Sequence, residues 1–202
     1  MNLAETKVQI QSIKAEHDLL VKQIQQDKIL HDSKLNMLED LEEARIIFQK
    51  SAQITQKQIS FHIENIVSHA LAAVFDSPYE FKVDFVTRRN VTECDLLFID
   101  EQGAELKPLE SCGYGAADIA SLALRVAYWK LSDGVRNTLI LDEPARNLSL
   151  DKQPLASRMI RELSKTLNIQ FLIVTHSRAL AAEAEKQFEV TRNKTISKIK
   201  EI

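Results

Sequence analysis

The first 75 residues contain neither glycine nor proline, and this feature most constrains what the chain can fold into. The 202-residue chain has four glycines, of which Gly103 is the first, and its first proline is Pro78. Because these residue types are the ones that break helices, the opening segment is predicted to form one long α-helix. Its apolar residues fall near coiled-coil spacing, with Lys, Glu and Gln between them. They include Leu3, Ile10, Ile13, Leu20, Ile24, Leu38, Leu41 and Phe48.

Residues 1–57 are therefore predicted to be a coiled-coil arm. The alternative is an ordinary amphipathic helix that folds back on the rest of the chain. From Gln58 to Phe75 the apolar stripe widens, so this end of the helix is expected to dock on a globular body. The predicted domains are thus an arm at 1–57 and a body at 58–202.

The hydrophobic period changes to two after Pro78, which predicts antiparallel strands. Apolar helices and apolar strands then alternate, as in an α/β fold with parallel strands. The two strands at 138–142 and 169–176 are predicted to be buried. The expected strands are 81–86, 94–100, 105–107, 138–142, 169–176, 188–192 and 195–200, and the expected helices are 116–131, 154–167 and 178–186.

Composition narrows the class of protein. The chain is 45% hydrophobic and 27% charged, with a net charge of −3, so charge gives no overall signal for nucleic acid. No uncharged apolar run is long enough for a membrane span, and the N-terminus has no secretory signal, which predicts a cytoplasmic protein without membrane contact. Cys94 and Cys112 form neither a CxxC pair nor a metal cluster, so we expect free thiols.

The strand at 138–142 ends in two carboxylates, Asp142 and Glu143, followed by Pro144. This is the form of a Walker B motif, placed where ligands bind in an open α/β sheet. Asp142 would orient Mg²⁺ through its water shell, and Glu143 would polarise the water that attacks a γ-phosphate. A polar loop that simply stops the strand is the alternative.

Two further segments stand around these acids in a recognisable order. A glycine-containing loop, 111–116, opens the helix that carries Ala120–Arg125, and Val174–Ser177 follows the next apolar strand. The order resembles the signature motif, Walker B, D-loop and switch histidine of ABC ATPases. Residues 120–127 look like the helix after the signature in SMC, RecN and SbcC-type DNA-repair ATPases. The resemblance covers residues 80 to 200 in detail and implies an ABC-ATPase C-terminal lobe, a mixed sheet with flanking helices, preceded by the family's returning coiled-coil helix.

The resemblance also implies roles for individual residues. The loop would present backbone N–H groups and a helix N-terminus to the γ-phosphate of ATP held by an opposite subunit. A tight turn before a buried helix is the alternative reading of its glycines. His176 would be the switch histidine, and Gly113 stands where the signature usually has a serine. The implied nucleotide-binding residues are Ser111, Cys112, Gly113, Tyr114 and Gly115, together with Asn147 and Ser149 of the D-loop segment 145–149.

The phosphate-binding loop GxxxxGK[ST] is absent from the sequence. That loop supplies the amide cradle and the lysine for the triphosphate, so ATP and Mg²⁺ are expected only in a head completed by another chain. The CxxC of the SbcC zinc hook is also absent. Because the sequence begins within the returning coil, we expect a separately encoded half of a head, or a relict of one.

Two functions follow from this reading. The first is the C-terminal half of a split SMC/SbcC-like ATPase in DNA repair, recombination or DNA-end processing, inactive alone and completed by a P-loop-bearing lobe or SMC-like subunit. DNA and a nuclease would be reached through the complex, and self-association is expected without the partner. The alternative is a non-catalytic protein that binds or inhibits another SMC-like ATPase. The two acids favour the first, and Gly113 favours the second. A third possibility is a purely structural coiled-coil protein. The motifs within residues 105–180 argue against it.

Overall fold

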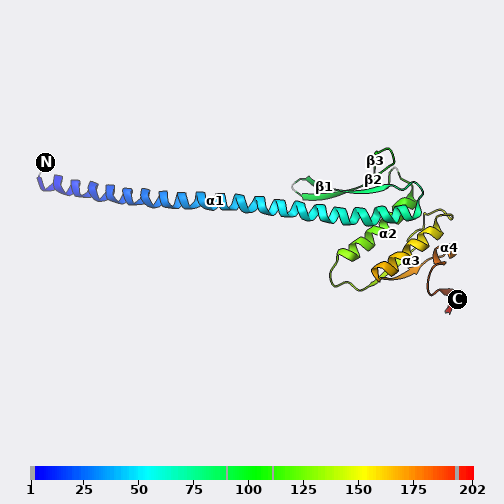
Figure 1. The fold of residues 1–202 in the computed structure, drawn as a ribbon. Coiled ribbons are helices and arrows are strands. Elements are labelled where there is room, and N and C mark those ends of the chain that lie inside the picture. The colour runs from blue at the N-terminus through cyan, green and yellow to red at the C-terminus, as the bar shows by residue number, and fades with distance from the viewer. Residues whose placement is uncertain (1–2, 90, 111, 194–195) are drawn as a thin grey trace. The chain divides into compact units, whose positions relative to one another are not determined.

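The computed structural model describes residues 3–89, 91–110, 112–193 and 196–202. The chain divides into two compact units, Met1–Thr55 and Gln56–Ile202. Helix α1, Leu3–Val74, begins in the first unit and ends in the second (Figure 1). The long helix predicted from the absence of glycine and proline is therefore confirmed, at 72 residues. The arm boundary at residue 57 stays a prediction.

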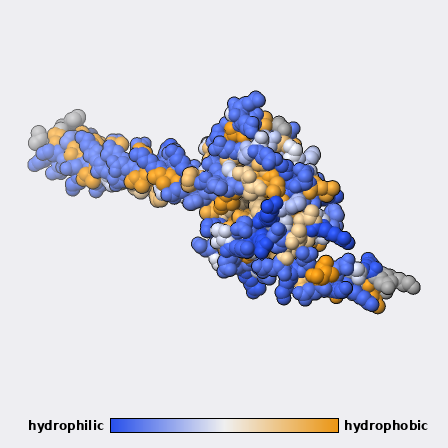
Figure 2. Space-filling model, turned by 45° about the vertical axis from the view of Figure 1, so that its right-hand side comes forward, coloured by the Kyte–Doolittle hydropathy of each residue, from blue (hydrophilic) through white to orange (hydrophobic). Residues whose placement is uncertain are grey.

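The described residues of the first unit all belong to α1, and almost all of the side chains described there face solvent. Between residues 7 and 55, every side chain except that of Ala44 is exposed. Figure 2 shows hydrophobic patches between hydrophilic ones along this helix. No helix in the described part of the chain is long and apolar enough to cross a membrane. The exposed apolar residues include Val8, Ile10, Ile13, Leu20, Ile24, Leu38, Leu41 and Phe48.

In the second unit, strands β1 (Glu80–Arg88) and β2 (Val91–Ile99) form an antiparallel hairpin, and β3 (Glu105–Leu106) pairs antiparallel with β2. The alternating pattern after Pro78 predicted this arrangement correctly. The hairpin turn includes Arg89 at φ +52°, in the left-handed region that tight turns use.

Strand β4 (Thr138–Asp142) pairs in parallel with β5 (Gln170–Val174), as predicted. Helix α2 (Tyr114–Leu131) precedes β4, and α3 (Gln153–Leu167) connects the two strands. Helix α3 has a proline in its first turn, where no hydrogen-bond donor is needed. It ends at Asn168, which adopts the left-handed conformation, φ 53°, common at helix C-termini.

The prediction that β4 and β5 are buried strands is wrong for one of their two faces. Side chains alternate between half-buried or buried and exposed along both strands. One face packs in the body of this unit. The other face carries Ile140, Leu172 and Val174, which are 71%, 55% and 59% exposed. Their apolar composition fits burial, but no described residue covers that face.

Helix α4 is shorter than predicted. It runs only from Arg178 to Ala181, whereas the helix-forming sequence continues to residue 186. Tertiary hydrogen bonds override this propensity, because the Glu183 amide donates to the Ser157 hydroxyl and the Gln187 side chain donates to the carbonyl of Ala181. Two further strands follow, β6 (Phe188–Asn193) and β7 (Ile196–Glu201), where the sequence predicted them, and the structure pairs them as an antiparallel hairpin.

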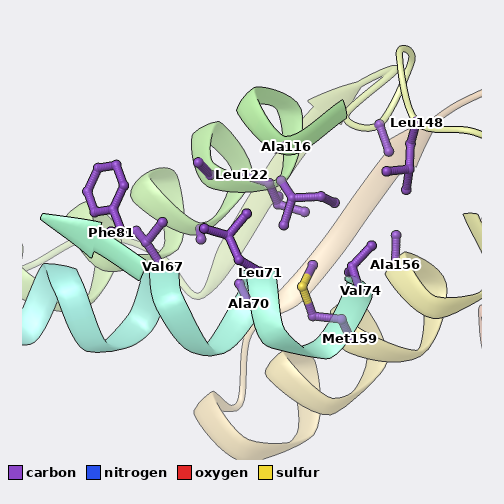
Figure 3. Close-up of a cluster of buried hydrophobic side chains, with 14 of the residues drawn as sticks. Val67, Ala70, Leu71, Val74, Phe81, Ala116, Leu122, Leu148, Ala156 and Met159 are labelled. Carbon is purple, nitrogen blue, oxygen red and sulfur yellow. The ribbon is translucent and has the colours of Figure 1, made fainter. Parts of the chain in front are cut away.

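The core of the second unit forms around the C-terminal end of α1. Val67, Leu71 and Val74 are fully buried or nearly so and belong to one cluster with residues of β1, α2 and α3 (Figure 3). The predicted docking of residues 58–75 is confirmed. Full burial of such side chains stabilises the fold by roughly 1.5–3 kcal/mol each. The cluster also contains Phe81, Phe98, Ile119, Leu122, Ala156 and Met159.

Candidate functional site

The carboxyl ends of the parallel strands β4 and β5 bring together two segments that lie far apart in the sequence. Asp142, the last residue of β4, pairs with Val174. The Glu143 amide then donates to the Val174 carbonyl over 2.9 Å. This bond extends the ladder by one residue, and it places Glu143 beside Thr175 and His176.

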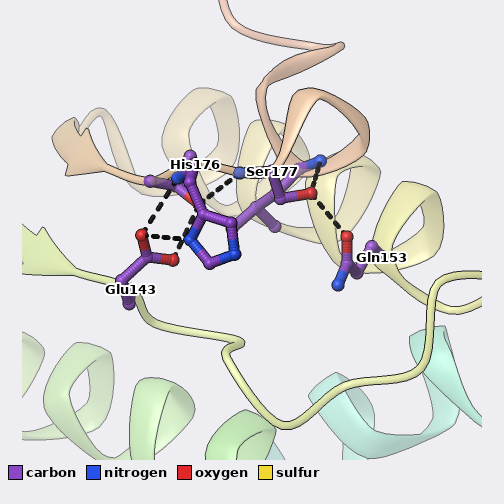
Figure 4. Close-up of polar contacts among 6 residues, drawn as sticks. Glu143, Gln153, His176 and Ser177 are labelled. Atoms are coloured by element: carbon purple, nitrogen blue, oxygen red, sulfur yellow. Dashed lines mark hydrogen bonds and ion pairs between the residues drawn. The ribbon is translucent and has the colours of Figure 1, made fainter.

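Both carboxylate oxygens of Glu143 accept hydrogen bonds from that segment (Figure 4). Oε1 lies 2.9 Å from the His176 amide nitrogen and 2.7 Å from ring Nδ1, while Oε2 accepts from the Thr175 hydroxyl at 3.0 Å. The side-chain bond from His176 is the main reason that the pKa of Glu143 is lowered; the bond from Thr175 also lowers it, and burial opposes it. Because a carboxylate only accepts, Nδ1 is the donor, and Nε2 is left as the free ring nitrogen.

Glu143 also has an unusual backbone. Its φ is +43°, in the left-handed region that costs a non-glycine residue free energy. Such conformations persist where the surrounding structure determines them and are common at functional sites. Here the bonds to Val174, Thr175 and His176 fix both the backbone and the side chain of Glu143.

The loop after Glu143, residues 144–149, is held against the N-terminal end of α2. The backbone amide of Asn147 donates to Asp118 Oδ2 at 2.8 Å, and its side-chain amide donates to Oδ1 at 3.3 Å. A Cβ atom on Gly115 would lie 3.2 Å from the Asn147 carbonyl oxygen and 3.3 Å from Leu148 Cδ1. Gly115 therefore permits the close approach of α2 and the 144–149 loop.

The other residues of the predicted signature loop lie in different surroundings. Ser111 lies outside the described residues. The Cys112 side chain is buried in the core, and this burial raises the pKa of its thiol. Gly113 and Tyr114 are exposed, and no atom lies within 4 Å of a Cβ built on Gly113. The structure thus brings Gly115 to Asn147 and Glu143 to His176. The Ser149 side chain is exposed, and its presence beside Asp151 lowers the pKa of that carboxyl.

A second set of hydrogen bonds connects the His176 segment to the 144–149 loop, and sequence reasoning missed its members. The Ser177 hydroxyl donates to Gln153 Oε1, and Gln153 Nε2 donates to the Leu148 carbonyl at 3.1 Å. Ser177 directly follows His176 and could have been found by its place in the motif. Gln153 and Asp118 carry no local signal, because only tertiary contacts give them these partners.

The described residues fit one half of a nucleotide–magnesium site. Asp142 offers an exposed carboxylate, the hard oxygen ligand that Mg²⁺ prefers, and the exposed N-terminus of α2 offers amides to a phosphate. No group of three or more His, Cys, Asp and Glu side chains placed to hold a metal occurs in the described part of the chain. The phosphate cradle would have to come from elsewhere.

The fold matches known structures. A head domain with coiled coil and joint from Pyrococcus yayanosii Smc superposes with a TM-score of 0.60 at 17% identity, over 85% of this chain and 33% of that one. The Pyrococcus furiosus Smc head with an extended coiled coil, bound to the C-terminal domain of ScpA, gives 0.58 at 19%, over 98% and 52%. The chain has the fold of the C-terminal lobe of an SMC ATPase head.

The chain spans about a third of one of these SMC heads and about half of the other. A further SMC ATPase structure, described for ATP-driven dimerization and DNA-stimulated activation, gives a TM-score of 0.57 at 16% identity, over 74% of this chain and 88% of that one. No protein-family model matches the chain, and no curated protein matches it in sequence. The matches to SMC head structures confirm the predicted SMC-like fold with a long N-terminal helix.

Proposed function

We propose that the chain is the C-terminal half of a split SMC-like ATPase head whose P-loop lobe is a separate polypeptide. The observation that carries the proposal is the open face of the β4–β5 sheet, formed by Ile140, Leu172 and Val174. Exposed apolar patches of this kind mark surfaces that bind another protein. The patch lies on β4, which ends at Asp142, and on β5, which ends at Val174. A partner on this face would lie next to the exposed Asp142, which Glu143 directly follows.

The small size of this sheet supports the same proposal. Within the described residues, β4 and β5 form a sheet of only two strands. Isolated two-stranded sheets are marginal in water, and each unpaired edge presents backbone groups that can pair with another strand. A partner lobe that added strands and covered the open face would satisfy both needs.

In the completed head the chain would contribute three chemical groups. Asp142 would hold Mg²⁺ through water, Glu143 would orient the attacking water, and His176 would bond to the γ-phosphate. Both oxygens of Glu143 accept hydrogen bonds in this structure, and Oε1 accepts two of them. The His176 ring, whose side chain is 82% exposed, would have to leave Oε1 to make room for a water, while the His176 amide still donates to that oxygen. Bound nucleotide would supply the competing acceptor for His176.

The roles in DNA repair, recombination and DNA-end processing belong to this proposal. They rest on the resemblance of residues 120–127 to the helix after the signature in DNA-repair ATPases and on the SMC fold. One similar structure is that of an SMC ATPase with DNA-stimulated activation. In this proposal the partner would bind DNA or a nuclease, and this chain would reach them through the partner.

The decisive experiment is copurification of the tagged full-length chain from its native host, followed by an ATPase assay. We expect a chain that bears GxxxxGK[ST] to copurify and the complex to hydrolyse ATP. Ile140→Lys should abolish both, because it places a charge on the open face. Ile199→Lys is the matched control, since Ile199 of β7 is also 71% exposed. Retention of the P-loop chain by the Ile140→Lys variant would exclude this face as the interface.

The second candidate is a non-catalytic protein that binds or inhibits another SMC-like ATPase. It is favoured by Gly113, whose position usually carries the signature serine, and by the full engagement of Glu143. This function predicts a complex that lacks ATPase activity, or lower activity of the partner's own head. Measuring the partner's ATPase activity with and without this chain separates the two functions.

A further inference from the structure

The buried side chain of Gln153 hydrogen-bonds to both the His176 segment and the 144–149 loop. Gln153, at the start of α3, is 8% exposed and is one of two buried polar residues in the described chain, with Ser157. Its Oε1 accepts from the Ser177 hydroxyl, and its Nε2 donates to the Leu148 carbonyl. A buried amide with both ends bonded rigidifies the groups it joins, because any unpaired end would be costly.

The bonds continue from Ser177 to the carboxylate of Glu143. The Ser177 amide donates to Thr175 Oγ1 at 3.1 Å, and that hydroxyl donates to Glu143 Oε2 at 3.0 Å. The Ser177 hydroxyl also caps α4 by accepting from the Leu180 amide. An unbroken series of hydrogen bonds therefore runs from the Leu148 carbonyl to Glu143, and Figure 4 shows its central part.

We propose that Gln153 is a positioning residue that couples the 144–149 loop to the carboxylate of Glu143. A displacement of the loop would move the Leu148 carbonyl, and Gln153 would pass this movement to the segment that holds Glu143. Asp118 fixes the other side of the loop through Asn147, so α2 belongs to the same set of contacts. The hydrogen bonds of Gln153 and Asp118 are observed in this chain by itself. Their effect on ATP hydrolysis rests on the proposed function.

Amide hydrogen exchange of the full-length chain tests the coupling without any partner. Gln153→Met retains the volume of the side chain and removes both hydrogen bonds. We expect exchange at the amides of His176 and Ser177 to become about tenfold faster, since each depends on the held segment. Ser157→Ala is the matched control: it removes buried bonds to Leu180 and Glu183 from the same helix. It should accelerate exchange at Glu183 instead. Unchanged or equally accelerated His176 exchange in the two variants would overturn the proposal.

A double-mutant cycle tests whether the loop and the Glu143 segment communicate through Gln153. Asp118→Ala releases Asn147 and should accelerate His176 exchange in the wild-type background, although Asp118 does not contact that segment. In the Gln153→Met background the same change should add nothing, whereas independent sites add their effects. Additive effects would show that the loop does not act through Gln153.

Two further variants keep the proposal testable if Gln153→Met does not fold. Ser177→Thr keeps the hydroxyl and should preserve wild-type exchange at His176, while Ser177→Ala should accelerate it. In a reconstituted head, Gln153→Met should lower kcat and leave KM for ATP unchanged. A head that hydrolyses no ATP at all would defeat the proposed function, and the exchange results on the isolated chain would still decide the coupling.

Discussion

The ring of His176 donates from Nδ1 to Oε1 of Glu143 over 2.7 Å, and it does so from an exposed position while the carboxylate is largely covered. The two residues follow different strands, so their bond exists only because β4 and β5 pair in parallel with this register. Of the two partners, the histidine ring has the more freedom to move. A phosphate that attracted the ring would remove one of the two hydrogen bonds to Oε1 of Glu143 and leave the bond from the His176 amide.

We predict that the isolated chain binds ATP only weakly, with a dissociation constant in about the millimolar range. Its phosphate-facing groups are the N-terminus of α2 and an exposed carboxylate, and the carboxylate repels a triphosphate unless Mg²⁺ intervenes. Isothermal titration calorimetry of the isolated chain measures this directly. Micromolar affinity in a preparation free of contaminating ATPase would contradict the need for a second lobe.

In a reconstituted complex that hydrolyses ATP, Glu143→Gln should lower turnover by roughly 10² or more and leave ATP binding largely intact. The amide keeps the size of the side chain but cannot take a proton from water, so the ATP-bound assembly should accumulate. Asp142→Asn should weaken Mg²⁺-dependent binding itself. Unchanged turnover in Glu143→Gln, with Asp142→Asn only destabilising the fold, would make both acids structural.

The two glycines at the start of α2 should respond differently to alanine. Gly115→Ala should destabilise the chain by about 1 kcal/mol and displace the 144–149 loop, because its Cβ would press on backbone atoms of Asn147 and Leu148. Gly113→Ala is the control, since its Cβ would meet nothing within 4 Å and its φ is −50°. Urea unfolding measures the stability difference, and equal midpoints for the two variants would refute the close-packing role of Gly115.

The ion pair between Asp76 and Lys152 should make stability depend on pH. The bond from Lys152 lowers the pKa of the Asp76 carboxyl. A lowered carboxyl pKa stabilises the folded chain above the ordinary aspartate pKa, and this contribution is lost as pH falls through the folded value. Asp76→Asn should therefore be less stable than wild type at pH 7 and approach it near pH 3.

Urea unfolding at the two pH values provides the measurement for this ion pair. Asp40→Asn is the control, since Asp40 has no ion-pair partner among the described residues of α1. A wild-type advantage over Asp76→Asn that is the same at pH 7 and pH 3 would show that the ion pair does not contribute. The effect should be small, because the Asp76 side chain is largely exposed and solvent screens the pair.

The sequence by itself determined the local features of this protein. A run without glycine or proline predicted α1, alternation of apolar residues predicted the β1–β2 hairpin, and the apolar strand before Asp142 predicted β4. These features depend on backbone sterics and on the period of apolar residues, which a chain carries in every conformation. The roles expected for Glu143 and His176 came from the resemblance to ABC ATPases, and their proximity depends on the pairing of β4 with β5.

Only the tertiary structure decided the rest. Whether both faces of β4 and β5 are covered depends on which layers pack on them, and apolar composition alone led to the wrong expectation for Ile140 and Leu172. Helix α4 stops at Ala181 because Ser157 bonds to the chain beyond it, against local propensity. The roles of Asp118 and Gln153 are contacts between segments remote in sequence, and side-chain hydrogen bonds of that kind leave no periodic pattern from which they could be predicted.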